Sequence, residues 1–318
     1  MDGNRATGLL LGLACGDALG RPVEFKSTAE IKGEHGEVTE MLGGGTHKKP
    51  PGTVTDDTEL ALCIAQSLVQ CDGFKPADVA ERFVAWYDSH PFDVGLMTTE
   101  TLRRLKRGDD WDTAGQTVWE SRPEGQNAGN GSVMRCVPYA IAFQDDPKRL
   151  QEISQTSSAI THADPRCTYG CAVLNRTLAS LLAGDLDPLD SALNNVAGDA
   201  PQELLDALRP VPDDIDPATL QSSGYVIHTL QTGLYHGLTA ADPQEGIIKA
   251  VNMGRDTDTV GAVTGAVVGA RFGASAIPDD WCEELTIDTK HRTVPEWWPA
   301  TQPTAEALRQ FAQHLQEL

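Results

Sequence analysis

Apolar residues along most of the chain recur with the spacing of α-helices rather than with the alternation of strands. The segment 57–70, DTELALCIAQSLVQ, repeats them three and four positions apart, which would give one buried helical face. Further segments with this spacing are 76–90, 137–143, 149–161, 167–184, 225–238 and 243–253. Strand-like alternation is almost absent, so the pattern predicts an all-α fold without a sheet of any size.

Two apolar segments carry a glycine at every fourth position. These glycines are Gly8, Gly12, Gly16 and Gly20 in the first, and Gly261, Gly265, Gly269 and Gly273 in the second. A glycine inside a helix costs about 0.8–1 kcal/mol relative to alanine, so two such rows are unfavourable unless close approach of the backbones offsets the cost. We predict two central, closely packed helices, and packing against each other would use both rows.

The composition is that of a globular protein with a strongly acidic surface. Hydrophobic residues make up 40% and charged residues 22% of the 318 residues. Asp or Gly interrupts every apolar stretch before it reaches the roughly 20 residues of a membrane span. The formal net charge of -21 argues against a nucleic-acid surface, which needs clustered Lys and Arg, and makes a cation site easier to accept.

The N-terminus and the cysteines indicate a mature cytoplasmic protein. The segment MDGNRATGLLLGLACGDALG has the short apolar run of a signal peptide, but an acid precedes its single Arg and Asp17 interrupts its small-residue end. We interpret it as a helix of the mature fold. The 7 cysteines are scattered and never spaced as CxxC, which predicts neither a zinc site nor a disulfide framework.

Two stretches lack a clear period. Residues 33–51 are rich in Gly, Lys and His, whereas the chain from Gly184 to Ser223 is acidic and bears prolines, as in PVPDDIDP. We expect residues 185–222 to form a surface insertion or a pair of short helices, and we assign no chemistry to them.

Acidic residues stand at three predicted turns or helix starts. The segments are GRPVEF with Glu24, GTVTDDTEL with Asp56 and Asp57, and GRDTDTVG with Asp256 and Asp258. In the second, Asp56 and Glu59 form a capping-box pattern, so an ordinary N-cap would explain a lone Asp. A cap uses one side chain, however, and Thr55 to Thr58 offer four consecutive oxygen-bearing ones.

The same surplus of oxygens recurs in Asp256, Thr257, Asp258 and Thr259. If the two helix starts face each other, their carboxylates converge, and uncompensated buried charges would be costly or would take up protons. A divalent cation resolves this conflict. Oxygen ligands without His or Cys in either motif favour Mg²⁺ or Mn²⁺ over zinc, and five acids including Glu24 are enough for two ions that activate water.

A third segment, GQNAGNGSVMRCVPYAIAF, places a glycine-rich loop at Gly129 to Ser132 before an apolar stretch. Backbone N–H groups at a helix start would suit a phosphate or pyrophosphate, although a plain turn fits equally well. His162, in THADPRC, is interpreted either as a structural residue at a helix end or as a catalyst. Tyr225 either stacks on a base or packs in the core.

Together these motifs resemble the ADP-ribosylglycohydrolase family, which includes dinitrogenase-reductase-activating glycohydrolase and the ADP-ribosylarginine and ADP-ribosylserine hydrolases. The resemblance covers nearly the whole chain, in the order GLACGDALGRPVEF, TDDTELALCIAQSL, GNGSVMRCVPYAI, THADPRC, SGYVIHTLQTGLY and GRDTDTVGAVTGAVVGARFG. It implies one compact all-α domain over residues 1–318, with two Mg²⁺ or Mn²⁺ ions in a cleft at helix N-termini.

The resemblance also implies roles for individual residues. The metal ligands would be Thr55, Asp56, Asp57, Asp256, Asp258 and Thr259, with Glu24 as a further ligand or the acid–base residue. Glu24, Asp57 and Asp256 would be catalytic. The substrate contacts would be Gly129, Asn130, Gly131 and Ser132 at the diphosphate or distal ribose, and His162 and Tyr225 near the ADP-ribose.

The activity that the resemblance implies is hydrolysis of ADP-ribose from a modified acceptor, in the first place arginine in a protein. Serine-linked or other ADP-ribosyl conjugates are the alternative. A two-metal pyrophosphatase would instead release AMP, and a silent binding or structural protein would have lost metal ligands that are all present here. We further expect a cytoplasmic monomer whose partner is an ADP-ribosylated protein, with no nucleic acid or membrane involved.

Overall fold

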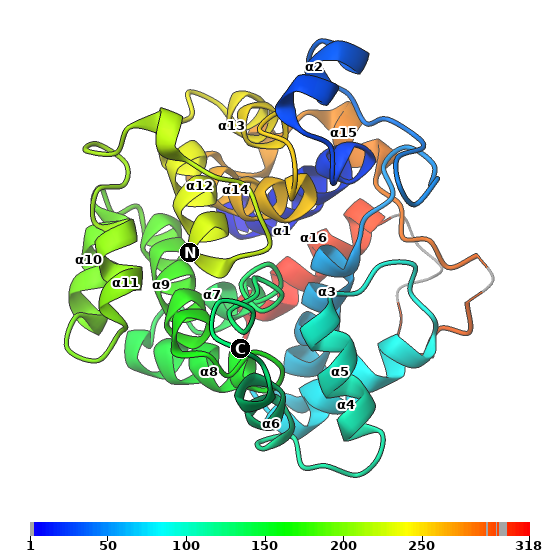
Figure 1. The fold of residues 1–318 in the computed structure, drawn as a ribbon, viewed down its shortest axis with the longest axis vertical. Helices are drawn as coiled ribbons and strands as arrows, with labels where there is room; N and C mark the ends of the chain where they lie inside the picture. Colours follow the sequence, from blue (N-terminus) through cyan, green and yellow to red (C-terminus); the bar gives the residue numbers. More distant parts are fainter. Residues whose placement is uncertain (1–2, 291, 297, 299–303) are drawn as a thin grey trace.

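The two glycine-rich helices, α1 (Gly3–Gly20) and α14 (Thr257–Phe272), lie side by side at the centre of the molecule (Figure 1). We describe this in a computed structural model that covers residues 3–290, 292–296, 298 and 304–318. Both helices are buried over most of their length. The stretch compared above with a signal peptide is therefore a central helix of the fold, as predicted.

The glycine rows of α1 and α14 face each other with no room for side chains. A Cβ atom added to Gly12 would lie 2.0 Å from the carbonyl oxygen of Gly265, and one added to Gly265 would lie 1.9 Å from that of Gly12. Equivalent contacts join Gly16 to Gly261. Only glycine permits this approach of two backbones, so the prediction that the rows pack against each other is confirmed.

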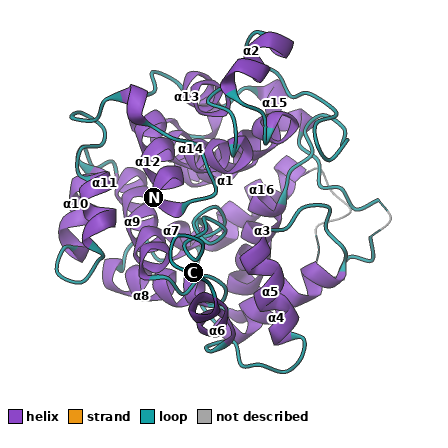
Figure 2. Ribbon diagram, viewed as in Figure 1, coloured by secondary structure: helices purple, strands orange, loops and turns teal. Residues whose placement is uncertain are grey.

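Around this pair the described residues form fourteen further α-helices and no strand, only isolated bridges (Figure 2). The helices are α2 (Thr28–His35), α3 (Asp56–Cys71), α4 (Pro76–Asp88), α5 (Leu96–Leu105), α6 (Ala114–Ser121), α7 (Pro138–Ala142), α8 (Pro147–Ala159), α9 (Pro165–Ala183), α10 (Pro188–Val196), α11 (Gln202–Leu208), α12 (Val226–Thr239), α13 (Pro243–Val251), α15 (Asp279–Glu284) and α16 (Thr304–Gln316). None of the helices described is long and apolar enough to cross a membrane. The prediction of an all-α fold is confirmed.

The seven segments with helical periodicity correspond to α3, α4, α7, α8, α9, α12 and α13. Five of these helices begin with proline, whose fixed φ suits a first helical turn and whose missing N–H costs nothing there. Residues 185–222 contain two short helices, α10 and α11, whose leucines are buried. That residues 185–222 are a surface insertion stays a prediction.

The outer helices are divided between two sides of the molecule. In Figure 1, α9 to α12 lie on one side and α3 to α5 on the other. α12 and α13 pack on α14, while α3 and α16 pack on α1. Since α1 contacts both α3 and α14, it is the common support of the two acid-bearing helix starts.

Candidate functional site

The acids predicted from the sequence line one cavity of about 550 Å³. Of the predicted residues, its lining includes Glu24, Asp56, Asp57, Asp256, Asp258, Thr259, Gly129, Asn130, Gly131, His162 and Tyr225. Asp93 also lines it. The six carboxylates of Glu24, Asp56, Asp57, Asp93, Asp256 and Asp258 are called the carboxylate cluster below. Thr55 and Ser132 are not among the lining residues.

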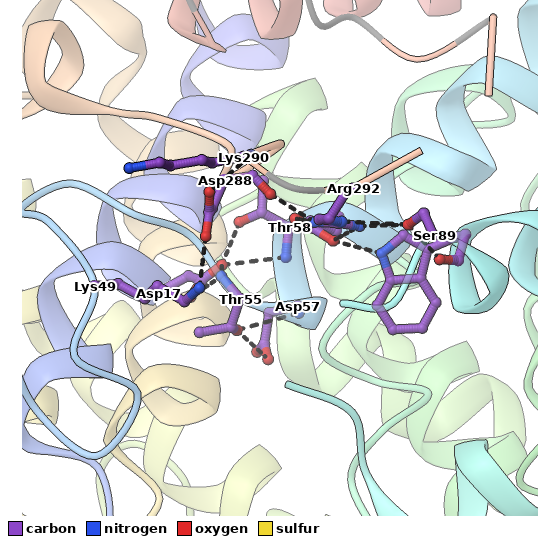
Figure 3. A network of polar contacts seen from close by, with 11 residues as sticks. Asp17, Lys49, Thr55, Asp57, Thr58, Ser89, Asp288, Lys290 and Arg292 are labelled. Atoms are coloured by element: carbon purple, nitrogen blue, oxygen red, sulfur yellow. Dashed lines mark hydrogen bonds and ion pairs between the residues drawn. The ribbon is translucent and has the colours of Figure 1, made fainter. Parts of the chain in front are cut away.

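The first turn of α3 is capped from another helix (Figure 3). The side chain of Asp17, on α1, accepts hydrogen bonds from the backbone N–H of Thr55 at 3.0 Å and of Thr58 at 3.2 Å, and from the Thr58 hydroxyl at 2.5 Å. Thr55 is the N-cap residue, and its hydroxyl accepts from the N–H of Asp57. Because these two residues satisfy the helix start, the carboxylates of Asp56 and Asp57 are free to face the cavity.

The capping box expected from Asp56 and Glu59 is wrong. The N-cap is Thr55, so the helix begins one residue earlier than a cap at Asp56 requires, and the Glu59 carboxylate instead forms a buried ion pair with Arg292, at 2.6 and 2.9 Å. Trp86 donates to the same carboxylate. Figure 3 shows Arg292 beside Ser89, to which it also donates. A buried partner distant in sequence, which no local pattern reveals, decided the role of Glu59.

The aspartates at the α3 start are buried beside other carboxylates. Burial raises the pKa of Asp56 and of Asp57 well above the range of an ordinary aspartate, and neighbouring carboxylates raise both pKa values further. The Oδ1 atom of Asp57 is buried and has no hydrogen-bond partner. A buried acceptor of this kind is costly unless something else binds it, and a divalent cation fits that need.

At the start of α14 the acids have polar partners. The Oδ2 atom of Asp256 accepts a hydrogen bond from the side-chain amide of Asn130 at 2.8 Å, and Asp258 accepts from the N–H of Thr259 at 2.9 Å. The hydroxyl of Thr257 donates to the carbonyl of Gly20, the last residue of α1, at 2.8 Å. The second helix start is thereby tied both to α1 and to the glycine-rich loop.

His47 and Asp93 belong to the site, although sequence reasoning passed over both. The Nε2 atom of His47 lies 3.3 Å from Oε2 of Glu24 and 3.7 Å from Oδ2 of Asp93. Among the described residues, these three are the group whose ligand atoms all lie within 4.8 Å of one another. Burial raises the pKa of Glu24 to about 7, against the lowering effect of its hydrogen bond from His47, and that bond raises the pKa of His47.

A buried arginine explains how His47 comes to lie beside Glu24 and Asp93. The guanidinium of Arg21 donates to four backbone carbonyls of the following loop, at distances of 2.9 to 3.1 Å. The acceptors are Leu42, Gly44, Pro50 and Thr53. Much of the irregular stretch 33–51 is thus folded around the Arg21 side chain. His47 lies between the residues whose carbonyls bind this side chain. An Arg directly after the first glycine row was the only sequence signal for this arrangement.

The glycine-rich loop packs on His162. A Cβ at Gly131 would lie 2.9 Å from a ring carbon of His162, so this position has no space for a side chain. Burial lowers the pKa of His162 to about 3, which keeps its imidazole neutral. The N–H of Asn130 is bonded to the carbonyl of Gly224 and is not available to an anion. The hydroxyl of Ser132 is bonded to that of Ser158, behind the loop.

Tyr225 is held at the cavity by charged neighbours. Its hydroxyl donates to Glu203 at 2.6 Å, and the guanidinium carbon of Arg166 lies 5.8 Å from its ring centroid. Burial raises the pKa of Tyr225 to about 12. Because Glu203 lies on α11, the segment 185–222, to which the sequence assigned no chemistry, contacts a residue of the cavity.

Comparisons with known proteins identify relatives of this chain. The sequence profile of the ADP-ribosylglycohydrolase family matches residues 2–315. The chain is 34% identical over 284 residues to the ADP-ribosyl-[dinitrogen reductase] glycohydrolase of Rhodospirillum rubrum, covering 89% of this chain and 91% of the relative. It is 31% identical over 301 residues to the ADP-ribosylarginine hydrolase Tri1 of Serratia proteamaculans, covering 89% and 75% respectively.

More distant and structural relatives give the same result. The human ADP-ribosylhydrolase ARH3 is 25% identical over 327 residues, covering 87% of this chain and 88% of the relative. A solved ADP-ribosylglycohydrolase-related protein complex superposes with a TM-score of 0.78 at 32% identity, covering 99% of this chain and 98% of its own. With the sequence profile, the relatives and the fold in agreement, the chain belongs to the ADP-ribosylglycohydrolase family.

Proposed function

We propose that the protein is a divalent-metal-dependent hydrolase that releases ADP-ribose from arginine residues of ADP-ribosylated proteins. The observation that carries the proposal is the buried, unpartnered Oδ1 of Asp57 within a cluster of six carboxylates around one cavity. The arginine linkage is favoured because a relative at 31% identity is an ADP-ribosylarginine hydrolase.

Two Mg²⁺ or Mn²⁺ ions fit the donor atoms of the two helix starts. Their proposed ligands are Thr55, Asp56, Asp57, Asp256, Asp258 and Thr259, with Glu24 beside them. Oxygen donors of this kind suit hard cations, and when bound the ions would hold ribose hydroxyls and acidify a water molecule. Thr55 lies outside the cavity lining, but its hydroxyl is 3.2 Å from Oδ2 of Asp57, so it reaches the site through that carboxylate.

The protein's own groups would handle the protons of the reaction. Burial raises the pKa of Glu24 to about 7 in the metal-free protein, and this carboxyl group would give a proton to the guanidine nitrogen as the glycosidic bond breaks. His47 fixes the orientation of the Glu24 carboxylate. Asp57 and Asp256 would orient the attacking water and the ribose from the two helix starts, and the hydrogen bond from Asn130 fixes one oxygen of Asp256.

The remaining predicted residues would bind the rest of the ADP-ribose. Gly129 and Gly131 leave space over the neutral ring of His162, where a side chain would fill the cavity. Tyr225 offers an aromatic face whose position Glu203 and Arg166 fix. Ser132 would support the loop through Ser158 rather than touch the substrate.

A substrate panel tests the proposal. Peptides carrying ADP-ribosyl-arginine or ADP-ribosyl-serine are incubated with the protein and Mn²⁺ or Mg²⁺, or with EDTA, and the products are separated by chromatography. We expect metal-dependent release of ADP-ribose from the arginine peptide. Release from the serine peptide alone would replace the proposed linkage, AMP as the product would indicate a pyrophosphatase, and no turnover of either peptide would reject the hydrolase.

A further inference from the structure

Large hydrophobic side chains are exposed at few places in the described part of the chain. Four are exposed: Phe25, Leu96, Leu186 and Leu318. Phe25 is 66% and Leu96 77% exposed, and both line the cavity that holds the carboxylate cluster. A single exposed leucine is ordinary, but two large exposed apolar side chains at one cavity indicate a contact surface.

Both residues belong to the segments that carry the carboxylate cluster. Phe25 directly follows Glu24. Leu96 is the first residue of α5 and follows Gly95, whose N–H donates to Oδ2 of Asp56 at 3.4 Å. The two side chains therefore come from separate segments, each connected to an acid at the proposed reaction centre. If the ribose of the substrate binds at the carboxylate cluster, the acceptor joined to that ribose has to extend out through the opening of the cavity.

The backbone at Phe25 is held in a conformation that disfavours a bulky residue. Its φ is 68°, in the left-handed region, and that of Arg255 is 66°. Two backbone hydrogen bonds fix this pair, from Phe25 N to Arg255 O at 2.6 Å and from Arg255 N to Lys26 O at 2.5 Å. Glycine would keep the same backbone without strain and without an exposed ring, so the fold itself does not require the Phe25 side chain.

We propose that Phe25 and Leu96 form a docking surface for apolar residues of the polypeptide that flank the modified arginine. This inference rests on the function proposed above and narrows its substrate to polypeptides. A free ADP-ribosyl-arginine ends in a charged amino-acid group that cannot cover two apolar side chains, whereas leucine or valine beside the arginine can bury them. The contact would act on substrate binding and leave the bond-breaking step to the carboxylate cluster.

Three substrates separate the docking surface from the reaction centre. One is a short peptide with ADP-ribosyl-arginine between leucines, the second is the same peptide with glycines in place of those leucines, and the third is free ADP-ribosyl-arginine. The variants are Phe25→Gly, which relieves the strain, Phe25→Asn, which tolerates the same backbone, and Leu96→Ser. Leu186→Ser is the matched control, because Leu186 is exposed at a different cavity.

We expect the unaltered protein to cleave the leucine peptide with a kcat/KM about tenfold above that for the glycine peptide, as for one apolar anchor of an interface. Phe25→Gly, Phe25→Asn and Leu96→Ser should each remove most of this preference through KM, with kcat and the cleavage of free ADP-ribosyl-arginine unchanged. Leu186→Ser should keep the preference, and Phe25→Leu should restore much of it. The Tm of Phe25→Gly should equal or exceed that of the unaltered protein.

Other outcomes are informative in different ways. Equal cleavage of both peptides by the unaltered protein would overturn the docking surface while leaving the hydrolase intact. An equal loss on all three substrates in the Phe25 variants would also overturn it, since the ring would then contact the ADP-ribosyl-arginine itself. No cleavage of any substrate by the unaltered protein would reject the proposed function and the docking surface with it.

Discussion

The two helix starts that supply the aspartates are built in different ways on the same support. The first turn of α3 is held by a side chain, because Asp17 of α1 caps it. The first turn of α14 has no side-chain cap; its backbone packs directly on α1 at Gly16 and Gly20, and the Thr257 hydroxyl adds one hydrogen bond to Gly20. A polar cap thus fixes one half of the site and close packing fixes the other.

The aspartates at the two helix starts also differ, in their burial and in their hydrogen-bond partners. Asp57 is 1% exposed and has a buried oxygen without a partner, whereas Asp256 is half-buried and accepts a hydrogen bond from Asn130. We therefore expect the α3 side of the site to depend on a bound cation, whereas the α14 side is already connected to the glycine-rich loop. Variants that affect one support and not the other separate these contributions.

Gly265→Ala should have the largest effect. The added methyl would lie 1.9 Å from the carbonyl oxygen of Gly12, and neither backbone can move without displacing a buried helix. We expect a loss of about 3 kcal/mol or more in unfolding free energy, measured by denaturant titration. The contact therefore predicts that even alanine at this position compromises folding.

Gly33→Ala is the matched control. Gly33 lies in the exposed helix α2, and a Cβ added there has nothing within 4 Å. Alanine should leave stability unchanged or raise it by up to about 1 kcal/mol. An equal loss of stability in both variants would show that the close contact between the glycine rows of α1 and α14 is not the cause of the loss in Gly265→Ala.

Asp17→Ala tests the polar support of α3. Removing the cap leaves the N–H groups of Thr55 and Thr58 without their acceptor, at a cost of about 1–2 kcal/mol. We also expect Mn²⁺ affinity to fall about tenfold by calorimetry, since the carboxylates of Asp56 and Asp57 lose their fixed positions. Asp146→Ala removes the cap of the distant helix α8 and should lower stability without changing affinity. A similar affinity loss in both variants would refute the positioning role of Asp17.

The stability of the metal-free protein should decrease as pH rises. The pKa of Asp17 is raised to about 6 and that of Glu24 to about 7, both chiefly by burial, so the folded protein binds these protons more tightly than the unfolded chain. The contribution of these two groups to folding stability is fully present below their pKa values in the unfolded chain, near 4. It is lost as the pH rises from about 4 to about 7. In thermal scans, the Tm gain from Mn²⁺ over EDTA should grow across this window. A gain independent of pH would contradict the buried acids as the metal site.

Thr257→Val should have the smallest effect. It removes the hydrogen bond from Thr257 to the carbonyl of Gly20 but keeps the side-chain shape and the backbone contact of α14 with α1. We expect a loss of about 1 kcal/mol in unfolding free energy and almost unchanged Mn²⁺ affinity. An affinity loss as large as that of Asp17→Ala would mean that α14 also depends on a side-chain support.

The sequence predicted what local patterns determine. Helical periodicity placed α3 and α12, the glycine rows predicted the central pair, and the surplus of oxygens at Asp56 to Thr58 pointed to the cavity. Long-range partners could not be predicted in the same way. Glu59 was taken for a cap because its partner Arg292 is distant in sequence, and His47 was overlooked because its position depends on how the loop folds around Arg21.

Metal binding to the two aspartate variants Asp57→Asn and Asp256→Asn tests the central claim most directly. Calorimetry with Mn²⁺ should find two ions bound to the unaltered protein, and each variant should lose at least one of them together with ADP-ribose release. Asp57→Asn should in addition raise the Tm in EDTA, because a neutral amide replaces an acid whose ionised form is disfavoured by burial and by the neighbouring carboxylates. Two variants that still bind two ions with unchanged affinity and release ADP-ribose at the original rate would contradict the account.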